Sequence, residues 1–178
     1  MRRHLALAAL VFVASCATPP AKKPASATGP KNGKREETTT IATGKVEAVA
    51  KDEEGRTVLS VRADTSDIEV GKSVGVSNLR VVDGEIYEEG KLKSRFRADR
   101  GTLDQVKRLI HAEGNVLVKA SDGAIALRAD SIDYRDGGNR IVAKGRVTVS
   151  SDTWKFGPFA DLYATPDLQR VGTPDRFP

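Results

Sequence analysis

Residues 91–98 read Lys-Leu-Lys-Ser-Arg-Phe-Arg-Ala, a strict alternation that puts apolar and small side chains on one face and four cations on the other. Apolar residues at every second position are typical of a β-strand with one buried face. Similar alternation recurs from residue 41 onward between short breaks of Gly, Asp and Asn. The best helical candidate, residues 102–112, is short and contains β-branched residues. The sequence therefore predicts an all-β domain of roughly 10 to 14 short strands.

The same region repeats itself. An apolar-Arg-Ala-Asp tetrad occurs three times and a degenerate fourth copy once, ending at Asp64, Asp99, Asp130 and Asp161. The last three copies are spaced by 31 residues. Aligning residues 94–120 with residues 125–151 without gaps gives eight identities, where composition alone gives about two. The domain is therefore built from repeated units of short antiparallel strands that stack on one another.

Each repeat has a simple physical interpretation. In the tetrad the apolar residue and the alanine face inward and the arginine faces water, and we expect the aspartate to bond the backbone at a corner as an Asx-turn. Gly114 and Gly145, at the same place in the two aligned repeats, suit a bend or bulge where no Cβ fits. Strands this short cannot bury a face alone, so the repeats form an elongated sheet that folds on itself and has an edge at each end.

The inward-facing apolar residues allow two interpretations: an ordinary closed core, which the residues alone favour, or a groove that opens to accept acyl chains. The set comprises Leu59, Val61, Leu92, Phe96, Val116, Val118, Ile125, Leu127, Val147 and Val149. Most aromatic residues lie instead in the last 25 residues, where they cap the core or form a partner surface. These are Trp154, Phe156, Phe159, Tyr163 and Phe177.

The N-terminus has the pattern of a targeting segment. Residues 1–15 combine two arginines with an apolar run, as in a secretory signal peptide. The following Cys16, preceded by Val-Ala-Ser, completes a motif that resembles the bacterial lipobox, and Cys16 is the expected lipid anchor. Residues 16–40 are rich in Pro, Ala and Lys and lack apolar periodicity, which predicts a disordered tether. Residues 41–165 form the predicted β domain and residues 166–178 a C-terminal tail.

Charge and composition exclude several classes of function. The 178-residue chain has 29 Lys and Arg against 24 Asp and Glu, a net charge of +5. The whole surplus lies in residues 1–40, so the β domain is neutral and a nucleic-acid partner is not indicated. One cysteine excludes an intramolecular disulfide. His111 is the only histidine after the signal segment, so no metal, cofactor or enzymatic site is expected. A glycosidase-like carboxylate pair is the alternative, but turn positions already explain the repeated aspartates.

A family resemblance adds to these inferences. The Arg-Ala-Asp strand ends and the segment Ala-Glu-Gly-Asn-Val-Leu-Val at 112–118 resemble the OstA/LptA/LptC superfamily of lipopolysaccharide-export proteins. The ordered runs at 55–64, 76–81 and 96–103 resemble its LptC branch most closely. The similarity spans about residues 43–151, which is most of the predicted β domain.

The resemblance implies an open β-jellyroll in the periplasm that binds lipopolysaccharide or a related glycolipid. It also implies an inner-membrane ABC transporter complex at the N-terminal sheet edge and a soluble LptA-like bridge protein at the C-terminal edge, joined by strand addition. The candidate edge residues are Val46, Ala48, Phe159 and Leu162. A lipid anchor replaces the transmembrane helix usual in this branch. The role favours the inner membrane, and the outer membrane stays open because Ala17 is not the aspartate of inner-membrane lipoproteins.

Two other functions are compatible with the residues. One is a structural envelope lipoprotein that assembles through its sheet edges without transporting lipid. The other is a polysaccharide-binding β-solenoid.

Overall fold

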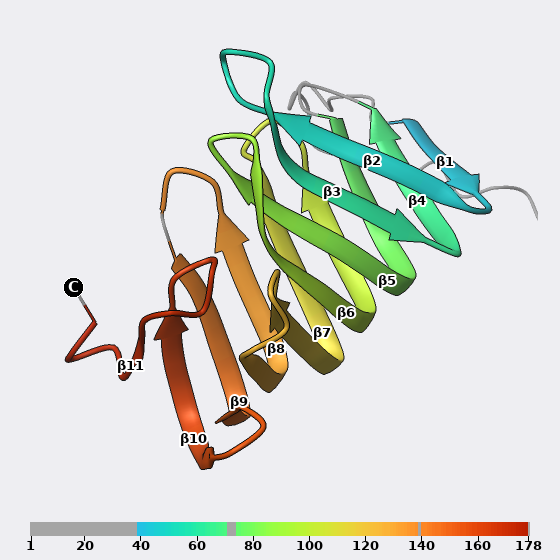
Figure 1. Ribbon diagram of the computed structural model, residues 1–178. Helices are drawn as coiled ribbons and strands as arrows, with labels where there is room; N and C mark the ends of the chain where they lie inside the picture. Colours follow the sequence, from blue (N-terminus) through green and yellow to red (C-terminus); the bar gives the residue numbers. More distant parts are fainter. Residues whose placement is uncertain (1–38, 71–73, 139, 178) are drawn as a thin grey trace, which may run out of the picture. The chain divides into compact units, whose positions relative to one another are not determined.

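The computed structural model describes residues 39–70, 74–138 and 140–177, which lie in one unit, Glu36–Pro178. These described residues form eleven β-strands (Figure 1). Their bounds are β1 Thr39–Thr43, β2 Val46–Lys51, β3 Thr57–Ala63, β4 Thr65–Val70, β5 Val74–Glu88, β6 Lys91–Asp104, β7 Leu109–Ala120, β8 Ala126–Arg135, β9 Arg140–Ser150, β10 Lys155–Ala164 and β11 Val171–Gly172. The predicted all-β class is confirmed. The best helical candidate, 102–112, lies in β6, a turn and β7.

The strands form a single open sheet in which every pairing is antiparallel. The order is β1-β4-β5-β6-β7-β8-β9-β10-β11, with β3 also paired to β5 and β2 paired to β3. The sheet forks at β5, because the first half of β5 pairs with β4 and its second half pairs with β3. Figure 1 shows this fork, with β2 beside β3 and β1 beside β4. The sheet does not close into a barrel, so it keeps an edge at each end.

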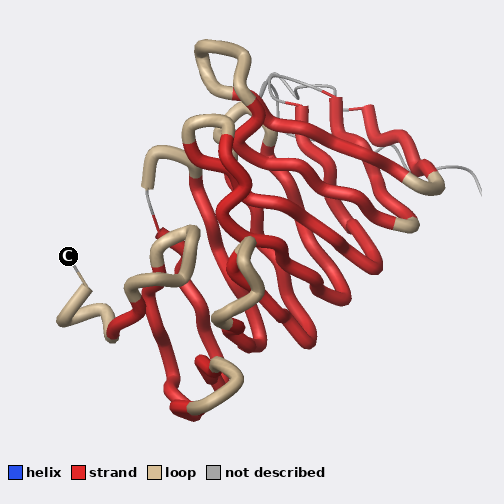
Figure 2. The backbone as a smooth tube through the Cα atoms, viewed as in Figure 1, coloured by secondary structure: helices blue, strands red, loops and turns tan. Residues whose placement is uncertain are grey.

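The long strands bend at a common corner. Every neighbouring pair from β5 to β10 contains a shift in register, and the shifts follow one another across the sheet. Figure 2 shows the strands turning back along one side while staying in strand conformation. The corner divides the sheet into two layers. The first layer contains β2, β3 and those halves of the long strands that continue the sheet from β3. The second layer contains β1, β4 and the other halves of the long strands. This confirms a sheet that folds on itself.

The alternation of buried and exposed side chains along each long strand changes at the corner. In β6, Ser94, Phe96 and Ala98 are buried before the corner, and Gly101 and Leu103 are buried after it. The parity changes because two consecutive residues at the bend face outward. A one-residue slip moves a whole run of side chains to the other face of a strand. Here the slip compensates for the fold in the sheet, so both halves of the strand face the same interior.

The interior between the layers is a continuous apolar core of the described residues. Its largest fully buried side chains are Tyr134, Leu59, Leu79, Ile86, Leu103, Ile110, Leu127, Ile132, Ile141, Leu168, Val61 and Val82. Aliphatic and alanine side chains predominate, as the sequence predicts. The segment predicted as a C-terminal tail is part of this structure, since it contains β11 and buries Leu168.

Candidate functional site

Two aspartates of the repeated tetrad, Asp99 and Asp130, lie at the corner, where each faces a glycine of the next strand. Asp99 accepts a hydrogen bond of 2.7 Å from the side-chain amide of Asn115. Asp130 accepts hydrogen bonds of 3.0 and 3.1 Å from the Arg146 Nε. The predicted Asx-turn is therefore wrong at these two positions: the carboxylates bind side chains across the strand pair. The Arg146 hydrogen bond lowers the pKa of Asp130 below its ordinary value.

The predicted bend at Gly114 and Gly145 is confirmed. Both residues have positive φ angles, +79° and +72°. A Cβ added to Gly114 would lie 2.8 Å from Asp99 Oδ2, and one added to Gly145 would lie 2.8 Å from the Asp130 Cβ. The glycines therefore allow the aspartate side chains to lie against the backbone of the neighbouring strand. The residues that follow them, Asn115 and Arg146, also have positive φ.

The ten candidate groove residues all lie in the first layer, including the part of it next to the corner. Eight of them are buried, and Leu92 and Ile125 are half-buried. The structure packs these side chains against the second layer, so the interior is filled by protein atoms in the described part of the chain. Leu92 and Ile125 lie near the ends of strands in the first layer, on the side opposite the corner.

Sequence reasoning missed the second layer of the core, which Leu79, Leu103, Ile110, Ile132 and Ile141 help to form. The alternation of Ile132 with Tyr134 and of Ile141 with Ala143 was the signal that could have found it. Tyr134 is the largest of the fully buried side chains, and burial raises its pKa above the ordinary range.

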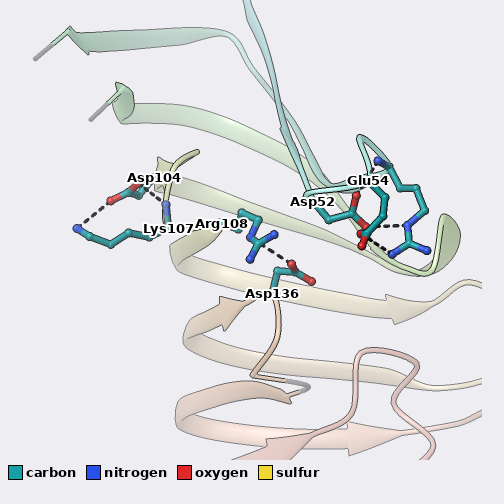
Figure 3. Close-up of polar contacts among 7 residues, drawn as sticks. Asp52, Glu54, Asp104, Lys107, Arg108 and Asp136 are labelled. Atoms are coloured by element: carbon teal, nitrogen blue, oxygen red, sulfur yellow. Dashed lines mark hydrogen bonds and ion pairs between the residues drawn. The ribbon is translucent and has the colours of Figure 1, made fainter. Parts of the chain in front are cut away.

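Charged side chains gather in and beside the β2–β3, β6–β7 and β8–β9 turns, at the strand ends opposite the corner (Figure 3). A groove of about 490 Å³ lies there between the β2–β3 turn, the β5–β6 turn and the β8–β9 turn. Its lining is mainly acidic and includes Asp52, Glu88 and Asp136. Ion pairs hold its borders, with Arg56 Nε 2.7 Å from Asp52 and Arg108 Nε 3.3 Å from Asp136. Burial raises the pKa of Glu88.

An apolar pocket of about 440 Å³ opens at the C-terminal end of the sheet. It is lined by Ile125, Val149, Trp154, Phe156, Phe159, Leu162, Leu168, Gln169, Val171, Gly172 and Thr173. Trp154 and Phe156 form its exposed border, with ring centroids 5.2 Å apart, and 60% of the Phe156 surface is exposed. Buried Val149, Leu162 and Leu168 form its floor and belong to the core. The pocket is therefore continuous with the apolar interior.

The sheet edges at β2 and at β10 differ. At the N-terminal end, Val46 is half-buried and Ala48 is buried in β2, and the β2–β3 register is regular from Val46 to Ala50. At the C-terminal end, Phe159 is exposed and Leu162 is buried in β10. Two register shifts interrupt β10, and β11 pairs with it only at its last two residues. Pro158 also removes a backbone donor there.

The histidine among the described residues lies beside a carboxylate. His111 Nδ1 lies 2.7 Å from Asp133 Oδ1 on the outer face of the second layer. In the same part of the chain, no group of three or more His, Cys, Asp or Glu side chains could hold a metal ion. No helix among the described residues is long and apolar enough to span a membrane. The predicted signal segment, the lipid anchor Cys16 and most of the tether lie outside the described residues.

No family model and no curated protein matches the sequence.

Proposed function

We propose that this protein is a lipid-anchored periplasmic protein that binds lipopolysaccharide or a related glycolipid and passes it along a bridge of β-jellyroll proteins without chemistry. The observation that carries the proposal is the apolar pocket at the C-terminal end, which is open to solvent and continuous with the core. An exposed apolar patch joined to the interior is a feature of ligand-binding grooves. The sequence resemblance supports the same role.

The physical basis of binding is burial of acyl chains among aliphatic side chains. Each methylene removed from water contributes about 0.8 kcal/mol. Because protein atoms fill the interior, we expect an acyl chain to enter at the strand ends of the first layer, on the side opposite the corner. Leu92 and Ile125 are the candidate groove residues nearest to that side, and Ile125 also lines the pocket. A partner ATPase supplies the energy of transfer.

Photo-crosslinking in cells tests this proposal. A photoreactive residue at Leu92 or Ile125 should capture glycolipid in cells with active export. Leu117 is the matched control, because it is a half-buried leucine in β7 at a position that alternates with the buried Val116 and Val118. Equal capture at all three positions, or capture at none of them, would contradict a lipid-binding interior.

Trp154 provides an independent measurement, since it is the only tryptophan and it lines the pocket. Titration of the purified protein with lipid A should shift the Trp154 emission to shorter wavelength, because the indole leaves water. A Phe156→Ser variant should weaken the shift by removing the neighbouring ring. An emission spectrum that does not respond to lipid A would count against binding at this pocket.

The anchor and the partners are separate parts of the proposal. Cys16→Ala should abolish metabolic labelling with fatty acid and release the protein from the membrane fraction. Crosslinkers in β2 and in β10 should report the transporter complex and the bridge protein, respectively. Retention of Cys16→Ala in the membrane would overturn the anchor while leaving the lipid-binding test intact.

A further inference from the structure

The free side of β2 forms the N-terminal edge of the first layer. In the part of the chain that the structure describes, β2 pairs with β3 on one side and with no strand on the other. From Val46 to Ala50 it has neither a proline nor a break in register. Two of its inward-facing residues are the alanines Ala48 and Ala50, which are 5% and 2% exposed. A regular edge strand without a proline or a bulge is a template for another strand.

One backbone contact shows which groups point outward from this edge. The side-chain amide of Gln105, in the β6–β7 turn, donates a hydrogen bond of 3.1 Å to the carbonyl of Val49. Carbonyls alternate between the two sides of a strand, so a Val49 carbonyl bound by a side chain outside the β2–β3 ladder faces the free side. Val49 is therefore the residue whose backbone would form hydrogen bonds with an added strand.

The sequence of β2, Val-Glu-Ala-Val-Ala-Lys, is complementary to itself around Val49. When a second copy is placed antiparallel with Val49 opposite Val49, Ala48 lies opposite Ala50 and Glu47 lies opposite Lys51. Both charged residues are exposed. Opposite charges at facing positions of antiparallel strands stabilise pairing by about 0.2 to 1 kcal/mol each. The two-fold axis produces this favourable pair twice.

We propose that the occupant of the β2 edge is a second copy of this chain, joined by antiparallel β2–β2 pairing centred on Val49. The contact is isologous and closes at two copies. Because a six-residue strand buries little surface, the dimer is weak and depends on concentration. The Gln105 side chain must leave the Val49 carbonyl for the strands to pair. A second copy and the transporter complex would use the same free side of β2, so the two pairings exclude each other. The dimer proposal rests on this edge and does not depend on lipid binding.

Charge variants of the full chain in detergent, examined by sedimentation velocity over a concentration series, test the contact. Lys51→Glu places like charges opposite each other twice and should weaken the dimer about tenfold, from the pair energies above. Glu47→Lys should also weaken the dimer, and it removes the 3.1 Å ion pair between Glu47 and Arg62 of β3 as well. Mixing the two variants should restore dimers, because each Lys then faces a Glu. Lys119→Glu, the same charge change at an exposed position in β7, should leave dimerisation unchanged.

Gln105→Ala should change the affinity of the dimer in the opposite direction. It frees the Val49 carbonyl and should strengthen the dimer, whereas disruption of a purely structural contact would leave dimerisation unchanged or weaken it. Circular dichroism confirms that each variant keeps its β structure. A protein that stays monomeric at all concentrations, a dimer that Lys51→Glu does not weaken, or a ladder of species larger than dimers would each overturn the proposal.

Discussion

Replacement of Gly145 by alanine tests the corner at its most crowded point. The φ of Gly145 is +72°, which costs an L-residue about 1 to 2 kcal/mol. The added Cβ would also lie 2.8 Å from the Cβ of Asp130 and 2.9 Å from its Cγ. Forcing a methyl group into packed space costs about 1 to 3 kcal/mol more. We therefore expect Gly145→Ala to lower the free energy of unfolding by about 2 to 5 kcal/mol, measured by urea denaturation.

Gly123 is the matched control for the backbone contribution. Its φ is +77°, and nothing lies within 4 Å of an added Cβ. Gly123→Ala should therefore lower the free energy of unfolding only by the cost of the left-handed conformation, about 1 to 2 kcal/mol. The double variant of Gly145→Ala with Asp130→Ala should recover part of the crowding loss, because the Asp130 Cγ and carboxylate are gone. If Gly145→Ala and Gly123→Ala destabilise equally, the close approach of Asp130 does not hold the corner.

Three further predictions concern single side chains. Val81 has φ +53°, where asparagine is tolerated better than a β-branched residue, and it is 56% exposed. Val81→Asn should therefore raise the free energy of unfolding by about 1 kcal/mol. The same change at exposed Val106 should change it by less than about 0.5 kcal/mol. Because burial raises the pKa of Tyr134, the unfolded state loses its proton first above pH of about 10, and stability should fall by up to about 1.4 kcal/mol per pH unit there. Tyr134→Phe should flatten this dependence in urea titrations at pH 9 to 11. Leu168→Ala should lower the free energy of unfolding by about 2 to 5 kcal/mol. Leu117→Ala, at a half-buried position, should lower it clearly less. Equal losses of stability in the two variants would mean that the C-terminal segment does not cap the core.

The corner could be predicted from the sequence because its cause is local. A glycine at the same place in each repeat, two residues before an alternating Val-X-Val run, marks a position where a Cβ does not fit. The repeated aspartate marks the facing strand. What these aspartates bind could not be predicted, since the partners Asn115 and Arg146 become neighbours only when the register shift is known. Asn115 and Arg146 differ between the repeats, yet each binds the aspartate at the equivalent position of its own repeat.

The second layer and the pocket depend on long-range packing, and this limited the prediction. Leu168 ends a run in which Leu162, Ala164, Pro166 and Leu168 are buried at alternate positions. The Pro-Asp pair before it is typical of a turn, so the sequence predicts a tail from residue 166. The position of Leu168 is set by the β10–β11 turn, where Thr165 and Asp167 bind each other and the backbone. The sequence places Trp154 and Phe156 in an aromatic-rich C-terminal segment, but only the fold brings them beside Ile125 of the β7–β8 turn.

The unequal edges limit how the unit can assemble. A sheet with two regular edges would join head to tail without end, because heterologous contacts that do not close form filaments. Here Pro158 and two register shifts interrupt β10, whereas β2 keeps a regular, self-complementary row. Pairing through β2 alone stops at two copies. It also leaves the aromatic end of each copy accessible, so occupancy of the β2 edge and access to the C-terminal pocket are separable properties of the same sheet.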